Sequence, residues 1–153
     1  MRLSTWKRTV VSGVAVAGIA VGTLAGASAA AAAPVNTAPA VTAEIAPQAV
    51  ENLGLSVRQA KGLQHRLQVV GHNPGAIDGY LGTNSWKALQ RSLRTHGYTG
   101  AIDGIVGPNT IRALQRALKE DFGYTGAIDG IAGSGTRAAF ARCGNHWANQ
   151  YGY

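Results

Sequence analysis

The sequence Gly75-Ala76-Ile77-Asp78-Gly79 occurs three times in this chain and decides how the remainder is interpreted. The second copy spans residues 100–104 and the third spans residues 126–130. The aspartate moves from position 78 to 103 and then to 129, which is a period of 25 or 26 residues. Self-similarity at a fixed period of this length is typical of repeat proteins, in which each unit packs against its neighbours.

Each copy has the residues of a tight turn. An aspartate accepts backbone N–H groups a few residues ahead, and the glycine after it can adopt a positive φ. Twelve of the 21 glycines in the chain lie in or beside the three loops, so the high glycine content reflects the repeat rather than low complexity. The residues predicted to have this structural role are Asp78, Gly79, Asp103, Gly104, Asp129 and Gly130.

Apolar residues between the loops follow a helical period. They include Leu63 and Leu67, then Leu89 and Leu93, with Trp86 on an apolar stripe that predicts burial in the core. Leu-Gln pairs recur at one equivalent position, as Leu63-Gln64, Leu89-Gln90 and Leu114-Gln115. We predict an all-α fold, a small bundle of about four helices built from a helix–loop repeat.

The fourth predicted helix is the weakest. It spans residues 136–142, with Phe140 where the earlier helices have leucine. Gly144 stands where a further leucine is expected, so we predict that this helix ends early. The residues after it form a predicted aromatic tail over 144–153.

The N-terminal residues have the pattern of an export signal. Basic residues at positions 2, 7 and 8 precede an uncharged apolar run that ends in Ala-rich sequence, as secretory signal peptides do. We predict a signal peptide over residues 1–33, with cleavage after Ala29 as an alternative to Ala33 and an uncleaved membrane anchor as the competing interpretation. Residues 34–55 are predicted to form a Pro/Ala-rich linker, and residues 56–143 the repeat domain.

Charge and cysteine content exclude some classes of protein. The net charge of +7 falls to +4 once residues 1–33 are removed, because eleven basic and seven acidic residues remain. These charges are scattered, whereas nucleic-acid-binding proteins usually carry a dense basic patch, so we expect no nucleic-acid partner. One cysteine, Cys143, excludes a disulfide framework and a Cys-rich zinc site.

The loop-and-helix pattern resembles the bacterial peptidoglycan-binding domain of the three-helix type. Its elements are a helix with Leu89-Gln90-Arg91, the pair Gly97-Tyr98, the loop 100–107, and Pro108-Asn109-Thr110 at the next helix start. The likeness covers roughly residues 56–142. It implies binding to the glycan or stem peptide of peptidoglycan, a secreted or wall-associated location, and a wall enzyme as a further candidate partner. Four helices and three loops depart from the usual three helices and two loops.

Ligand contacts require aromatic faces and hydrogen-bond donors. Tyr80 lies inside the first loop, Tyr98 and Tyr124 follow loop-opening glycines, and Arg91 and Arg116 follow Leu-Gln pairs. These five residues are the candidate ligand-binding residues. Packing over a helix end is the competing interpretation for the tyrosines, and plain solvation is the competing interpretation for the arginines.

A catalytic site is not evident in the sequence. Glu120 and Asp121 are adjacent on a helix end and cannot easily flank one glycosidic bond. Histidines lack zinc-ligand spacing, and Cys143 with His146 lacks the rest of a thiol-peptidase domain. We therefore expect no cofactor, no metal and a non-catalytic peptidoglycan-binding protein. The alternatives are a secreted protein–protein or inhibitor module and a small wall hydrolase.

Overall fold

The computed structural model describes residues 49–153, and the predicted signal peptide and most of the predicted linker lie outside this part. Within it the chain forms four α-helices and no strand, which confirms the all-α fold class. The helices are α1 (Val57–Val69), α2 (Thr83–Ser92), α3 (Pro108–Asp121) and α4 (Ser134–Gln150), with the 3-10 helix η1 (Leu93–His96) extending α2. None of these helices is long and apolar enough to cross a bilayer.

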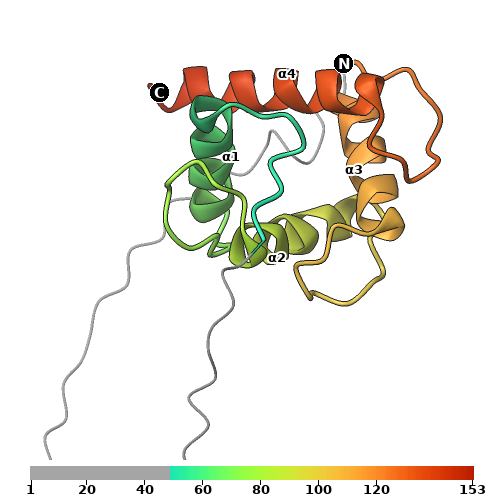
Figure 1. Cartoon of the computed structure of the whole chain (residues 1–153), viewed down its shortest axis with the longest axis horizontal. Helices are drawn as coiled ribbons and strands as arrows, with labels where there is room; N and C mark the ends of the chain where they lie inside the picture. Colours follow the sequence, from blue (N-terminus) through green and yellow to red (C-terminus); the bar gives the residue numbers. More distant parts are fainter. Residues whose placement is uncertain (1–48) are drawn as a thin grey trace, which may run out of the picture. The chain divides into compact units, whose positions relative to one another are not determined.

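The helices close into a ring. Helix α1 packs against α2, η1 at the end of α2 packs against α3, and α3 packs against α4. Helix α4 then packs against α1. Figure 1 shows the four helices around a central region, with a loop at each corner between consecutive helices. Equivalent positions of the four helices are buried in one hydrophobic core: Leu63, Leu89 and Leu114, with Phe140 in α4, are almost fully buried. Trp86 is buried there as well and packs against Phe140 with a centroid distance of 6.4 Å.

The fourth helix is longer than predicted. It continues through Gly144 to Gln150 instead of ending near residue 142, so most of the predicted tail is helical. Gly144 is buried because α4 passes close to α1 there: a Cβ on it would lie 2.7 Å from the Gln59 Cβ. The missing leucine therefore marks a close helix crossing rather than a helix end.

The last residues of the predicted linker belong to the folded domain. Leu53 and Leu55 are buried in the core. The Asn52 side chain accepts the Leu81 N–H and donates to the Gly79 carbonyl, at 2.8 and 2.9 Å. This segment holds the first loop against α1, where the N-cap residue Ser56 and Gln59 form a capping box.

A buried glutamine anchors each Asp-Gly loop to the preceding helix. Gln115 Nε2 donates to Asp129 Oδ1 at 2.8 Å and to the Ile131 carbonyl at 3.1 Å. Its Oε1 accepts the Gly130 N–H at 3.0 Å, and a third contact joins Nε2 to the Thr136 hydroxyl at 3.2 Å. One side chain thereby links two helices to the loop between them.

The same arrangement occurs twice more. Gln64 contacts Asp78, Gly79, Tyr80 and Ser85, and Gln90 contacts Asp103, Gly104, Ile105 and Thr110. All three glutamines are 1% exposed or less. A buried amide with unsatisfied groups is costly, so these side chains fix the loop geometry.

The loop aspartates complete the turns. Asp103 Oδ1 accepts the Ile105 N–H at 2.9 Å, and Asp129 Oδ1 accepts the Ile131 N–H at 2.9 Å. The Ile105 N–H and then the Gln90 amide lower the pKa of Asp103, while the Gln115 amide and then the Ile131 N–H lower that of Asp129. For Asp78, burial raises the pKa, but the Gln64 and Tyr80 hydrogen bonds prevail and lower it. The carboxylates of all three aspartates are therefore hydrogen-bonded within their own turns.

Candidate ligand-binding site

Two of the candidate tyrosines are packed into their loops. Tyr98 and Tyr124 are only 5% and 7% exposed. Their hydroxyls donate to the Ala101 and Ala127 carbonyls at 2.6 and 2.7 Å. Burial and these contacts leave little of either ring for stacking on a ligand.

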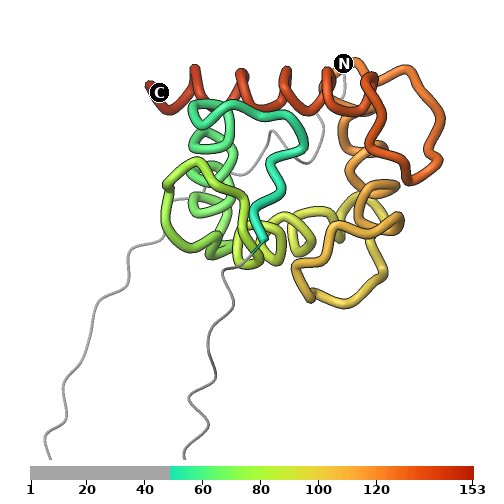
Figure 2. Tube along the Cα trace, viewed as in Figure 1, coloured from blue at the N-terminus to red at the C-terminus, as the bar shows by residue number. Residues whose placement is uncertain are grey.

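Tyr80 has the opposite environment. Its side chain is 53% exposed, on the turn of the first loop. Ile105 and Ile131 occupy the equivalent turns and are 66% and 67% exposed. The three loops lie at successive corners of the ring (Figure 2), so each repeat presents its turn residue at a different corner.

Arg116 and Arg142 support the ends of preceding helices. Arg116 Nη1 donates to the carbonyls of His96 and Gly97, at 3.2 and 3.3 Å. Arg142 donates to those of Phe122 and Gly123, at 2.9 and 3.0 Å. Cationic donors of this kind satisfy terminal helix carbonyls, so Arg116, a candidate ligand residue, has a structural role in this arrangement.

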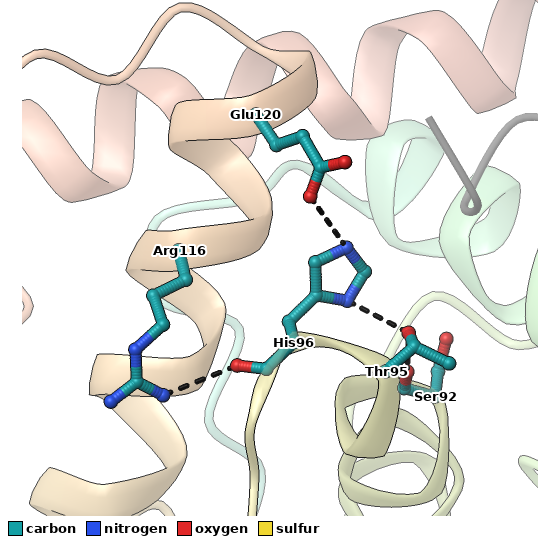
Figure 3. A network of polar contacts seen from close by, with 5 residues as sticks. All are labelled: Ser92, Thr95, His96, Arg116 and Glu120. Atoms are coloured by element: carbon teal, nitrogen blue, oxygen red, sulfur yellow. Dashed lines mark hydrogen bonds and ion pairs between the residues drawn. The ribbon is translucent and has the colours of Figure 1, made fainter. Parts of the chain in front are cut away.

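Figure 3 shows two side chains of α3 that contact His96 at the end of η1. Arg116 reaches the backbone of His96, while Glu120 Oε2 lies 3.5 Å from the His96 Nε2. On the other side, Thr95 Oγ1 lies 3.0 Å from His96 Nδ1 and donates to the Ser92 carbonyl at 3.0 Å. Burial lowers the pKa of His96, against the opposing effect of the Glu120 and Asp121 carboxylates. Glu120 is thus engaged at a helix–helix contact rather than only solvated.

Arg91 is the equivalent arginine of α2 and is placed differently. No hydrogen bond joins its guanidinium to another described residue, and a Cβ on Gly71 would have no atom within 4 Å. At the equivalent Gly97, by contrast, a Cβ would lie 3.2 Å from the Arg116 Nη1. Arg91 instead lines an open depression of about 350 Å³.

We call this space the Arg91 depression. It is lined by Gly71, Asn73, Gly75, Asn84, Lys87 and Arg91. Lys87 and Arg91 are four residues apart on α2 and therefore share a helix face. The Asn73 Oδ1 accepts the Gly75 N–H at 3.0 Å, which leaves the amide nitrogen of Asn73 as its available donor.

A second depression adjoins the first. It has a volume of about 200 Å³ and contains Tyr80, Asp78 and Ser85. The two depressions share Gly75 and Asn84, so they form one surface along the first loop. This surface combines two cations, the Asp78 carboxylate, further polar side chains and one exposed aromatic ring.

The third repeat lacks this combination, whereas the second has Asn109 and Arg112 at the positions of Asn84 and Lys87. The depression of the third repeat contains Arg142, Gly135 and Ala138, where the first has Arg91, Asn84 and Lys87. The first loop is also one residue longer between its opening glycine, Gly71, and Gly75 than the second loop between Gly97 and Gly100. The first repeat therefore has polar donors that the third repeat lacks, and an opening loop that is longer than that of the second.

The candidate catalytic residues are dispersed. Cys143 is fully buried in the core, while His146 is exposed. Residues 49–153 contain no group of three His, Cys, Asp or Glu side chains arranged to hold a metal ion. Burial and the charge of Arg91 lower the pKa of His72. The charges that act on His96 are instead those of Glu120 and Asp121, so the two histidines have different neighbours.

Comparison of the chain with protein-family models, with curated proteins and with solved structures finds no match.

The sequence pointed to part of this site. Tyr80 and Arg91 were candidates and lie on the surface along the first loop. Lys87, Asn73 and Asn84 were not candidates. The spacing of Lys87 and Arg91 is a detectable signal, but recognising the asparagines required knowing how the first loop meets α2.

Proposed function

We propose that this protein is a secreted, non-catalytic peptidoglycan-binding protein. The observation that carries the proposal is the surface along the first loop, where Tyr80, Lys87 and Arg91 line two adjoining depressions. Its support from sequence is the loop-and-helix resemblance to wall-binding domains and the signal-like N-terminus.

The chemistry of the surface suits a glycopeptide. An exposed tyrosine ring can pack on the apolar face of a sugar, and guanidinium, ammonium and amide groups can donate to hydroxyls and carboxylates. Open, shallow depressions suit an extended polymer better than an enclosed small molecule, because specific small-molecule sites usually bury most of their ligand.

The direct test is co-sedimentation of the mature protein with purified, protein-free cell-wall sacculi. We expect binding that weakens in Tyr80→Ala and in Arg91→Gln, with Ile131→Ala as a matched control for removal of an exposed turn residue. A protein that stays in the supernatant at all wall concentrations contradicts the proposal. Release of soluble wall fragments during the incubation would instead support the hydrolase alternative.

One observation favours a second candidate function. Ile105 and Ile131 are large apolar side chains held on exposed turns, and apolar side chains on a surface can serve as contacts for another protein. A secreted protein–protein or inhibitor module would use them. Cross-linking in culture medium should then yield one stoichiometric protein partner, and Ile105→Ser should abolish the cross-link without changing sedimentation with sacculi.

A further inference from the structure

We propose that the Arg91 depression binds a free carboxylate, and that in peptidoglycan this is a carboxylate of the peptide stem. The assignment to the stem rests on the proposed function. The carboxylate preference itself rests on the residues that line the depression and on how its arginine differs from the equivalent arginines of the other repeats.

The lining is cationic and rich in donors. Lys87 and Arg91 are its two charged residues, and Asn73 and Asn84 are its two amides. No acidic side chain lines it. Lys87 also acts on Asp103, as the smallest of the effects that lower the pKa of that carboxyl, but Asp103 is not part of the lining. A guanidinium can bind both oxygens of a carboxylate, which makes a carboxylate the fitting occupant.

Arg91 differs from the equivalent arginines of the other repeats in its hydrogen bonds. Arg116 and Arg142 donate to the carbonyls at the end of the preceding helix. In the first repeat these carbonyls belong to the segment around Gly71, where the space beside the Cα is empty. The extra residue in the first loop accompanies this opening. Arg91 therefore has donors that the fold itself does not use.

Neutral sugars would not require this lining. Hydroxyl groups are bound adequately by amides and hydroxyls, whereas two cations four residues apart repel each other weakly, and an anion bound between them reduces that repulsion. A carboxylate between Lys87 and Arg91 would relieve that repulsion. The adjoining depression with Tyr80 would then contact the part of the ligand next to the carboxylate.

The test uses two soluble peptides, N-acetyl-D-Ala-D-Ala with a free C-terminal carboxylate and the same peptide with a C-terminal amide. Binding to the folded protein is followed by the NMR shifts of the Gly71 and Gly75 amides. We expect the acid to bind at least about tenfold more tightly than the amide, the effect of losing one charge-assisted interaction of about 1.4 kcal/mol. Binding of the acid should weaken as salt is added.

The variants are Arg91→Gln and Lys87→Gln, with Lys119→Gln as a control that removes the same charge from an exposed position of α3. Each of the first two should weaken binding of the acid by about tenfold, while Lys119→Gln should change it less than twofold. Thermal unfolding verifies that all three fold. Equal affinities for acid and amide, or equal effects of Arg91→Gln and Lys119→Gln, would overturn the inference.

The two proposals can fail separately. A protein that sediments with sacculi but shows no shift at Gly71 or Gly75 with the acid refutes the carboxylate site and leaves the wall-binding function standing. A protein that binds the acid through Arg91 but does not sediment with sacculi supports the carboxylate site and refutes the function.

Discussion

Gly62 of α1 lies directly against the backbone of Ala148 in α4: a Cβ on Gly62 would be 2.5 Å from the Ala148 Cα. This is the contact that closes the ring, since α1 and α4 are the first and last helices of the repeat and pack more extensively than any other pair of helices. Small residues at a crossing let two backbones approach closely, and here no side chain fits between them.

Gly62→Ala should destabilise the fold by about 3 kcal/mol, because the methyl group meets backbone that cannot move without separating α1 from α4. Alanine is otherwise the better helix former, so the sign of the change is diagnostic. Urea denaturation measures it.

Gly135→Ala is the matched control, since it makes the same change in α4 where the new Cβ would lie 3.6 Å from the Tyr124 ring. It should be neutral or stabilising by up to about 1 kcal/mol. Equal stability of the two variants would show that the crossing is not tight.

Gln115→Leu should lower the free energy of unfolding by about 3 kcal/mol, because it leaves the Gly130 N–H without its buried acceptor and removes the amide donor to Asp129. Gln115→Glu should also destabilise, since it replaces the donor to Asp129 by a second carboxylate. Gln68→Leu, on the exposed side of α1, is the control and should change stability by less than about 0.5 kcal/mol. If Gln115→Glu is as stable as the parent, the glutamine amide is not the anchor.

The two arginines should separate stability from binding. Arg116→Gln should destabilise by about 1 kcal/mol, because the His96 and Gly97 carbonyls lose a cationic donor at the partly exposed end of η1. Arg91→Gln should alter the unfolding free energy by less than about 0.5 kcal/mol. Thermal and urea unfolding measure the first effect. The reverse order would mean that Arg91 is the structural residue.

Stability should fall as the pH drops below the usual range for histidine. The pKa values of His72 and His96 are lowered in the folded state, mainly by burial. Protonation therefore favours the unfolded chain, and their contribution is present above pH about 6.5 and is lost on acidification. The urea midpoint should be lower at pH 5 than at pH 7.5, and less so in His72→Gln. A midpoint that rises over this interval would contradict the assigned direction.

A second loss should follow at lower pH. The loop aspartates have lowered pKa values because their carboxylates accept hydrogen bonds, for example Asp129 from Gln115 and Ile131. Their contribution is present above pH about 3.9 and is lost as the pH falls further. Asp129→Asn should reduce this second loss without affecting the first, which urea midpoints between pH 5 and pH 2.5 would detect.

Local chemistry made several features predictable. The Ile-Asp-Gly sequence specifies its turn through interactions within a few residues, and Gly79, Gly104 and Gly130 have the positive φ that the turn needs. Helical periodicity located most of α1, α2 and α3 and predicted the burial of Trp86. The Leu-Gln pairs were recognised as equivalent positions, yet their role was missed, because a glutamine beside a buried leucine resembles a surface residue until its partners across the loop are known.

Features that depend on distant segments were not predictable. The length of α4 was underestimated because Gly144 breaks the leucine pattern, and only the approach of Gln59 explains a glycine there. Residues 51–55 resembled linker, but Asn52, Leu53 and Leu55 pack against the first loop and the core. Among the candidate site residues, Tyr98 and Tyr124 were directed into their loops by carbonyls that no spacing rule identifies.

The amino-acid sequence by itself determined the all-α class, the three turns and the apolar stripe of the central helices, because these follow from interactions over one or two helical turns. Tertiary structure alone decided that α4 returns to α1 and that Gln64, Gln90 and Gln115 are buried anchors. It also decided that Arg116 and Arg142 are used by the fold while Arg91 faces an open depression. The same residue type at three equivalent positions acquires different roles because a side chain's partners are set by the neighbouring repeat, and the loop before Arg91 is longer.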